Sequence, residues 1–283
     1  MVEEIILQHS NRGMEKLQKY LPADYCERAA RAVFEWQRGC VFLTTGFYVA
    51  GAPETDGPPG LMVLAKTLEE LGFSVVVVTD IFCEGLFDDL ESVVYVPIRP
   101  EAMYFDRLIR KYQPVGMISI ERCGKNSQGD YANMRGISIA QYTASIDSLF
   151  ELAARQNIPT VGIGDGGNEI GMGVLKQQIE EQLALVPCVV PVDYLVIATV
   201  SNWGAYGLAA CLASCTDEGK HMAGHGFGRK RKSPLPTETW LRKYLENIVE
   251  KGAVDGVLGK PVVSVDGFPA DVEYQIFREL LAS

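Results

Sequence analysis

Short apolar runs alternate with helical patterns over most of the chain. Between residues 40 and 200, apolar segments of strand length are separated by stretches with the spacing of amphipathic helices. The predicted strands are Cys40–Phe47, Phe73–Thr79, Val93–Pro97, Val115–Ile120, Pro159–Ile163 and Tyr194–Val200, and the predicted helices are Pro59–Leu71, Glu101–Tyr112, Ile146–Gln156, Val174–Val186 and Ala205–Cys215. Because uniformly apolar strands that alternate with helices are typical of a parallel sheet covered on both faces, we predict an α/β fold with a mostly parallel, Rossmann-like sheet. Pro97 favours an edge position for its strand.

Further elements are expected at both ends of the sheet core, which spans residues 40–216. Residues 1–39 predict two helices, the first capped by Ser10 and the second beginning near Pro22. Residues 217–236 predict a long loop, because glycine, proline and basic residues dominate there. The elements expected in residues 237–283 are a helix from Thr237 to Lys251, a β-hairpin closed by Gly259-Lys260, and a helix from about Ala270. We expect residues 1–283 to form a single catalytic domain.

The composition and charge of the chain argue against some binding partners and favour one cellular compartment. The chain has 47% hydrophobic and 22% charged residues, which is ordinary for a soluble globular protein. Its net charge of −10 argues against nucleic-acid binding, and we interpret the short basic run at 228–232 as a solvated loop. The acidic N-terminus does not resemble a signal peptide, and no apolar run approaches the ~20 residues of a membrane span. Seven irregularly spaced cysteines favour reduced thiols, so we expect a cytoplasmic protein without membrane partners.

Polar residues follow the carboxyl ends of several predicted strands. In open parallel sheets, ligands bind at this edge. The residues expected there are Thr45, Glu54, Asp56, Asp80, Glu121, Arg122, Lys125, Asp165, Asn202 and Trp203. Carboxylates placed close together repel one another unless a cation, an ammonium group or a shared proton lies between them. The pattern therefore indicates a site for an amine or a cation.

Each of these residues also has a purely structural interpretation. Asp80 or Glu121 alone could cap a helix or pair with Arg122 or Lys125. Asn202 and Trp203 are compatible with capping and core roles as well as with ligand contact. The convergence of four acidic strand ends favours the functional interpretation for the group. His221 and His225 have the spacing of a helical metal pair, but the glycines beside His225 argue against a helix there.

The segment Gly162–Gly173 contains six glycines together with Asp165, Asn168 and Glu169. A glycine loop after a strand lets a ligand approach the backbone and presents N–H groups to it. The segment matches the dinucleotide-binding pattern formally, but Asp165 would repel a pyrophosphate. The next strand also lacks the acidic residue that binds a ribose. We expect neither a nicotinamide nor a flavin cofactor, and the P-loop pattern of nucleotide triphosphatases is absent.

Four motifs together resemble the D-glutamate cyclase family. They are Glu54-Thr55-Asp56-Gly57-Pro58-Pro59-Gly60, Ile120-Glu121-Arg122 with Gly124, Gly164 to Gly173, and Ser201-Asn202-Trp203-Gly204. The tail segment Val265 to Pro269 is also similar, and the resemblance covers roughly residues 40 to 270. Cys123 departs from the family's expected proline. Larger members resemble this chain only in their C-terminal part.

The resemblance implies a hydro-lyase of amino-acid metabolism that dehydrates D-glutamate to 5-oxo-D-proline. In our hypothesis Asp165 or Glu169 binds the substrate ammonium, and one of them acts as the general base. Arg122 and Lys125, or a Mg²⁺ or Mn²⁺ ion held by Asp80, Glu121 and Asp165, would neutralise the γ-carboxylate. The substrate-binding residues of the hypothesis are Thr45, Asp56, Gly166, Gly167, Asn168, Asn202 and Trp203, with the glycine N–H groups and Asn202 on the α-carboxylate.

The sequence is also compatible with two other functions. A metal-dependent phosphohydrolase acting on a small phosphate ester would also use clustered acids at strand ends. A non-catalytic protein that binds an acidic amino acid would share the same pocket. A homo-oligomer, in which the tail hairpin extends the sheet of a partner, is compatible with the pattern.

Overall fold

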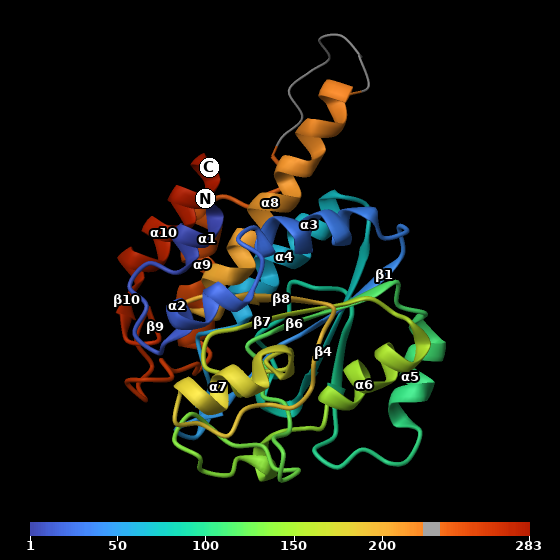
Figure 1. Cartoon of the computed structure of the whole chain (residues 1–283), viewed down its shortest axis with the longest axis vertical. Helices are drawn as coiled ribbons and strands as arrows, with labels where there is room; N and C mark the ends of the chain where they lie inside the picture. Colours follow the sequence, from blue (N-terminus) through green and yellow to red (C-terminus); the bar gives the residue numbers. More distant parts are fainter. Residues whose placement is uncertain (223–232) are drawn as a thin grey trace.

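A six-stranded parallel sheet forms the centre of the computed structural model (Figure 1). The order of its strands is β5 (Val93–Val96), β4 (Ser74–Asp80), β1 (Cys40–Thr44), β6 (Gly116–Ile120), β7 (Thr160–Gly164) and β8 (Tyr194–Ile197). All five pairings are parallel. The predicted α/β class is confirmed, and the strand that precedes Pro97 lies at an edge as expected. The strand order reverses direction between β1 and β6, where ligands usually bind in such sheets.

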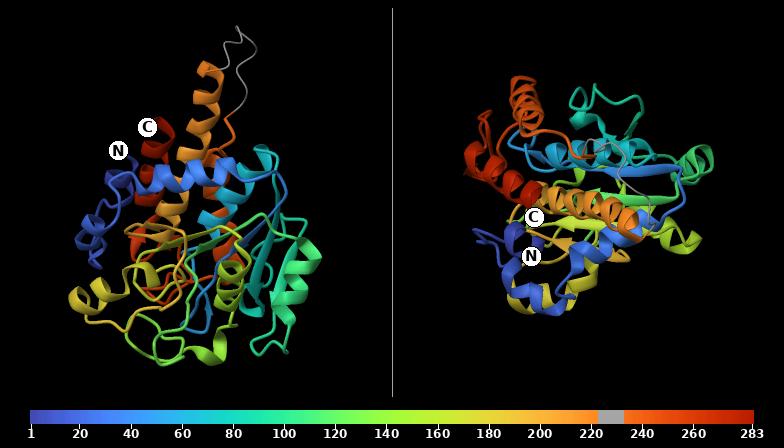
Figure 2. Two further views of the ribbon diagram at one scale, coloured as in Figure 1. Left: turned by 45° about the vertical axis from the view of Figure 1, so that its right-hand side comes forward. Right: turned by 90° about the horizontal axis from the view of Figure 1, so that it is seen from above.

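Helices cover both faces of the sheet (Figures 1 and 2). Helices α4 (Pro58–Glu70) and α8 (Ser201–Met222) pack against each other and against the sheet on one face. Helices α5 (Tyr104–Tyr112) and α6 (Asp147–Gln156) lie on the other. Helix α7 (Lys176–Gln182) is shorter than predicted, because a 3-10 turn occupies Gly173–Leu175.

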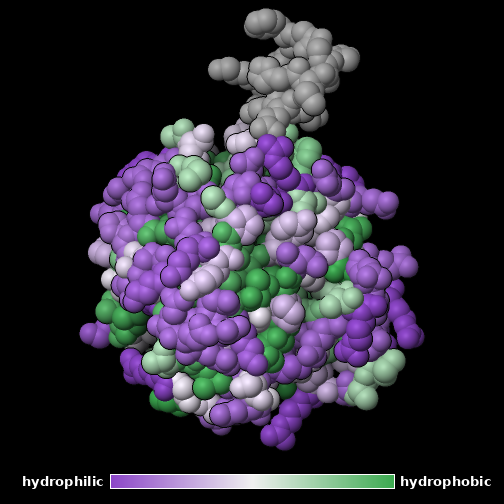
Figure 3. Space-filling view, in the orientation of Figure 1, coloured by the Kyte–Doolittle hydropathy of each residue, from purple (hydrophilic) through white to green (hydrophobic). Residues whose placement is uncertain are grey.

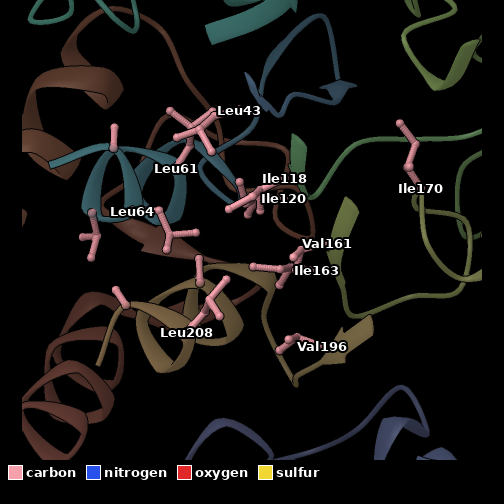
Figure 4. Close-up of a cluster of buried hydrophobic side chains, with 14 of the residues drawn as sticks. Leu43, Leu61, Leu64, Ile118, Ile120, Val161, Ile163, Ile170, Val196 and Leu208 are labelled. Carbon is pink, nitrogen blue, oxygen red and sulfur yellow. The ribbon is translucent and has the colours of Figure 1, made fainter. Parts of the chain in front are cut away.

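Aliphatic side chains fill the space between the sheet and the α4–α8 layer (Figure 4). Leu43, Ile118 and Ile163 come from the central strands and are completely buried. Leu64 from α4 and Leu208 from α8 are equally buried. Burial of a leucine-sized side chain contributes about 1.5–3 kcal/mol. This packing fixes the two helices whose first residues border the site described below.

The N-terminal region differs from the prediction. It forms α1 (Val2–Ile6), the single turn α2 (Met14–Leu17) and α3 (Tyr25–Glu35). Ser10 does not cap a helix, because its hydroxyl donates to Glu15 and the residue before α2 is Gly13. Gly13 has a φ of 93°, a conformation that glycine adopts without strain. Residues 7–13 therefore form an irregular link that leaves Arg12 free to reach the sheet edge.

The structure describes residues 1–222 and 233–283, with the side chains of 217–222 excepted. Within this part, α8 continues to Met222, so residues 217–222, which were predicted to belong to a loop, are helical. No proline interrupts residues 201–222, and the helix therefore extends beyond Cys215. The expectations for the 228–232 basic run and for His225 fall outside the described residues, as does that for the side chain of His221.

The C-terminal region forms α9 (Glu238–Glu250), the hairpin β9 (Ser264–Val265) with β10 (Phe268–Pro269), and α10 (Ala270–Ala282). Thr237 caps α9 as predicted. The expected hairpin turn at Gly259-Lys260 is wrong, because the two strands are joined at Asp266-Gly267. Asp255 holds the chain before the hairpin against the hairpin turn. Its side chain accepts hydrogen bonds from the N–H groups of Val257 and Gly267 and from the Ser264 hydroxyl.

Polar and charged residues cover most of the face shown in Figure 3, with apolar residues gathered near its middle. Within residues 1–222 and 233–283, no helix has the length and apolarity required to cross a bilayer. A second, two-residue hairpin, β2 (Tyr48–Val49) with β3 (Ala52–Pro53), follows β1 and leads to the first acidic motif.

Candidate functional site

Three buried carboxylates meet at the carboxyl edge of the sheet. Asp56 lies between β3 and α4, Glu121 directly follows β6, and Asp165 directly follows β7. Each offers an oxygen atom, and these three atoms lie within 4.8 Å of one another. Their residues are 1%, 6% and 0% exposed, respectively. The predicted convergence of acidic strand ends is therefore present, and the group can hold a cation.

Asp56 is fixed by the beginning of α8. Its two carboxylate oxygens accept hydrogen bonds from the N–H groups of Ser201 and Asn202, at 3.0 and 2.8 Å. The first N–H groups of a helix have no partner inside the helix, so a carboxylate in this position is favourable. The same contact joins the 54–60 motif to the 201–204 motif, which lie far apart in the sequence.

Glu121 has a strained backbone. Its φ is 43°, which is uncommon for a residue other than glycine, asparagine or aspartate. The Ser201 hydroxyl donates to one Glu121 carboxylate oxygen at 2.5 Å. Such strain persists where the surroundings impose it and is frequent at functional sites. Here it turns the Glu121 side chain toward Asp56 and Asp165.

Arg12 is a site residue that the sequence did not indicate. One guanidinium nitrogen lies 2.8 Å from Asp165 and 2.8 Å from Asp266. Arg12 comes from the irregular link before α2, and Asp266 comes from the turn between β9 and β10. Segments near the N-terminus and the C-terminus are therefore in contact beside Asp165, at the end of β7. Asp266 lies in the tail segment 265–269 that resembles the family, but it is not among the predicted site residues, and no pattern near residue 12 marks its arginine.

An open cavity of about 590 Å³ adjoins this cluster. Its polar lining comprises Arg12, Glu54, Glu121, Asn133, Arg135, Asn168 and Asp266, and apolar atoms are supplied by Phe47, Val49, Met134, Val257 and Leu258. The cavity lies at the sheet edge, the usual position for a ligand in this fold class. Its volume suits a molecule the size of an amino acid with room for water.

The carboxyl groups of the cluster hold protons more tightly than ordinary acids do. Burial raises the pKa of Asp165 to about 7, although the charge of Arg12 opposes this shift. Burial likewise raises the pKa values of Glu54, Asp56 and Glu121, and the charges of neighbouring acids raise them further. Among the described residues, the site therefore combines an excess of buried acids with the partly buried cation Arg12, as expected where protons move or a cation binds.

Asp80 and Arg122 form a separate structural pair. Their side chains are almost completely buried and lie 2.7 Å apart. The Arg122 guanidinium also donates to the carbonyls of Gly46 and Ala144. Asp56, rather than Asp80, accompanies Glu121 and Asp165. Lys125 pairs with Glu151 on α6, at 2.6 Å, and is not among the cavity-lining residues.

The glycine loop is closed by its own glutamate. The two carboxylate oxygens of Glu169 accept hydrogen bonds from the N–H groups of Gly166 and Gly167, at 2.8 and 2.7 Å. These N–H groups are therefore already engaged. Asn168 is 4% exposed, its Nδ2 donates to the carbonyl of Ala132, and its Oδ1 has no partner among the described residues. Oδ1 is thus an acceptor available to a ligand in the cavity.

The remaining predicted contacts belong to the scaffold around the site. The Oδ1 of Asn202 accepts hydrogen bonds from the N–H groups of Gly57 and Gly60, and its Nδ2 donates to the carbonyl of Thr55. Trp203 is completely buried and donates to Glu273 of α10. Thr45 is completely buried, and its hydroxyl has no partner among the described residues. None of these three lines the cavity, and of the acidic cluster only Glu121 does, since Asp56 and Asp165 are completely or almost completely buried and are not among the lining residues.

Glu273 gives a prediction about stability. Burial raises its pKa to about 7, although hydrogen bonds from Trp203 and Tyr206 oppose this shift. The folded state holds the Glu273 proton more tightly than the unfolded state does. The contribution of this proton to the free energy of unfolding is therefore complete below about pH 4.5 and is lost as the pH rises to about 7. The stability of the wild type relative to Glu273→Gln should therefore fall across this window, by up to about 1.4 kcal/mol per pH unit. Urea unfolding at pH 5, 6, 7 and 8 measures it, and a difference that is constant with pH would contradict the assignment.

Comparison with known proteins agrees with these motifs. A family model described as "D-glutamate cyclase-like, C-terminal" matches residues 2–281. The human protein named "D-glutamate cyclase, mitochondrial" is 32% identical over 266 residues, which covers 81% of this chain and 43% of the human protein. This chain thus matches less than half the length of that relative. Because the family model spans nearly the whole sequence, the chain belongs to the D-glutamate cyclase-like, C-terminal family.

Proposed function

We propose that this protein cyclises D-glutamate to 5-oxo-D-proline with loss of water. The observation that carries the proposal is Asp165, a completely buried carboxyl group that lies 2.8 Å from the Arg12 guanidinium and shares a hydrogen bond with Asp266. It belongs to an acidic cluster next to a cavity of amino-acid size. The substrate and the kind of reaction are taken from the human relative, which is named as a D-glutamate cyclase.

The cyclisation changes two bonds and moves two protons. The amine attacks the γ-carboxyl carbon, so a C–N bond forms and a C–O bond breaks. The ammonium group loses two protons overall, and the departing oxygen takes two protons to leave as water. Because the reaction neither releases nor consumes protons, a single group that accepts and then donates a proton suffices. Holding both reacting ends together supplies much of the rate in an intramolecular reaction.

Asp165 is the better candidate for this proton-transfer role. A general acid–base group works best when its pKa lies near the operating pH, and the pKa of Asp165 is raised to about 7. Both oxygens of Glu169 accept backbone hydrogen bonds, which restricts Glu169 to holding the loop. Asp165 thus accepts each of the two protons in turn from the reacting nitrogen and returns it to the departing oxygen.

The substrate ammonium fits the acceptor-rich side of the cavity. Asn168 Oδ1 is a buried acceptor without a partner among the described residues, and the carboxyl groups of Glu54 and Glu121 line the same cavity. An ammonium group brings three N–H donors and a positive charge. It satisfies the free acceptor and offsets the repulsion among the acids.

Asp56, Glu121 and Asp165 fit a divalent cation in their donor chemistry. Carboxylate oxygens are the ligands that Mg²⁺ and Mn²⁺ prefer, and one oxygen from each of the three residues lies within 4.8 Å of the others. When bound, such a cation would neutralise the γ-carboxylate, which is otherwise a poor electrophile. Asp56 and Glu121 would be the main ligands of the ion, because a cation bound directly to Asp165 would lower the pKa on which its proton-transfer role depends. Arg12 would keep the Asp165 side chain in place.

Removal of divalent cations is expected to lower turnover by about 10²-fold or more, because the γ-carboxylate then keeps its charge. Exhaustive chelation followed by titration with Mg²⁺ or Mn²⁺ measures this. The same titration should raise the melting temperature of the wild type but not that of Glu121→Gln. Full activity of protein shown to be metal-free would exclude a catalytic cation.

A substrate panel tests the proposed function. Purified protein is incubated with D-glutamate and with a general phosphate ester, each with and without Mg²⁺ or Mn²⁺. We expect 5-oxoproline from D-glutamate and no phosphate release. Metal-dependent phosphate release without 5-oxoproline would favour a phosphohydrolase. Tight binding of D-glutamate that is recovered unchanged would favour a binding protein.

A further inference from the structure

Arg135 presents an unpaired guanidinium group at the cavity. It lines the cavity and is exposed to solvent. Its side chain makes no hydrogen bond or ion pair with any residue in the described ranges 1–222 and 233–283. Its backbone is held, because the N–H groups of Arg135 and Ile137 both donate to Asn133 Oδ1, at 2.9 and 3.1 Å. The loop between β6 and α6 therefore holds the backbone of Arg135 at the cavity, while its side chain has no partner among the described residues.

A carboxylate of the substrate can bind in this acidic cavity only if a cationic side chain is available to pair with it. Glu54, Glu121 and Asp266 line the cavity and repel a second negative group. Two arginines also line it, but the Arg12 guanidinium is already shared between Asp165 and Asp266. Lys125 and Arg122 are paired elsewhere. Among the described cavity-lining residues, Arg135 is thus the cation without an acidic partner.

We propose that Arg135 binds the α-carboxylate of the substrate and thereby selects for amino acids with a free α-carboxylate. The assignment rests on the proposed cyclisation. The reacting amine and γ-carboxylate must lie against buried Asp165, whereas the α-carboxylate does not react. It therefore lies toward solvent, where Arg135 is exposed. A guanidinium group can bind a carboxylate through two parallel hydrogen bonds, which also orients the substrate.

The test compares two substrates in wild type and Arg135→Gln. D-Glutamate has both carboxylates, while its α-amide keeps the amine and the γ-carboxylate but lacks the α-charge. The variant should lose about 10- to 100-fold in kcat/KM for D-glutamate, the effect of a charged hydrogen bond. Its loss for the α-amide should be less than about threefold, because the contact is already absent there.

Two variants serve as controls. Arg135→Lys should recover part of the activity toward D-glutamate, because it restores the charge without the two-pronged geometry. Arg110→Gln removes an exposed arginine of α5 that does not line the cavity, and it should behave as wild type. The melting temperature of Arg135→Gln should also match that of wild type, since its side chain has no partner among the described residues.

The outcomes separate this assignment from the function on which it rests. Equal losses for the two substrates, or wild-type activity of Arg135→Gln toward D-glutamate, would overturn the role of Arg135 while leaving cyclisation intact. If the wild-type protein forms no cyclic product from either substrate, the proposed function fails and the assignment fails with it.

Discussion

Asp165→Asn is expected to lower kcat for 5-oxoproline formation by about 10³-fold. General acid–base catalysis contributes typically 10² to 10⁴-fold, and asparagine cannot accept and return the proton. The substitution also removes one carboxylate from the group formed with Asp56 and Glu121. Because asparagine has nearly the same shape, substrate can still enter the cavity. Initial rates with D-glutamate measure the effect, with metal supplied in excess.

Two checks separate a catalytic loss from misfolding. The neutral side chain relieves the burial of a charge, so the melting temperature of Asp165→Asn should not fall far below that of wild type. Asp271→Asn is the matched control, because the Asp271 side chain is 93% exposed on α10. It should retain wild-type turnover. A folded Asp165→Asn protein with near wild-type activity would refute the role of Asp165.

Arg12→Met is expected to lower the free energy of unfolding by about 3–5 kcal/mol near pH 8. The variant leaves Asp165 and Asp266 buried without the guanidinium that lies between them, and breaking a buried pair from one side costs this much. The loss should be smaller at pH 5, because Asp165, whose pKa is raised to about 7, is then protonated and no longer an unpaired charge. Urea unfolding at both pH values measures the difference.

The matching controls use one surface pair and one compensating change. Arg28 pairs with Asp24 on exposed α3, so Arg28→Met should change stability by less than about 1 kcal/mol. Adding Asp266→Asn to Arg12→Met should recover part of the loss, because it removes one unpaired charge. If Arg12→Met were as stable as wild type at pH 8, the ion pairs of Arg12 with Asp165 and Asp266 would make no contribution to the free energy of unfolding.

The sheet and its acidic edge were predictable because both depend on local patterns. Apolar runs define the strands, and the residue after a parallel strand necessarily lies at the carboxyl edge. Glu121 and Asp165 follow their strands in the sequence and therefore lie together in the structure. Asp56 could be placed only through its motif, since a hairpin separates it from β1.

Other features depend on contacts between distant segments. Arg12 lies in an irregular link without periodicity, and its partner Asp266 is 254 positions away (266 minus 12). Asp80 at the end of β4 and Arg122 after β6 pair across β1, which lies between these strands, so the pair is evident only once the strand order is known. Asn202 likewise looks like a ligand residue until the N–H groups of Gly57 and Gly60 are placed against it.

The most direct test of the central claim follows D- and L-glutamate by chiral chromatography during incubation with the metal-supplemented protein. We expect D-glutamate to disappear with the appearance of an equal amount of 5-oxo-D-proline. Asp165→Asn should leave it almost unchanged over the same time. Persistence of D-glutamate at its starting amount with the wild-type protein, under conditions in which it is folded and loaded with metal, would contradict the proposed function.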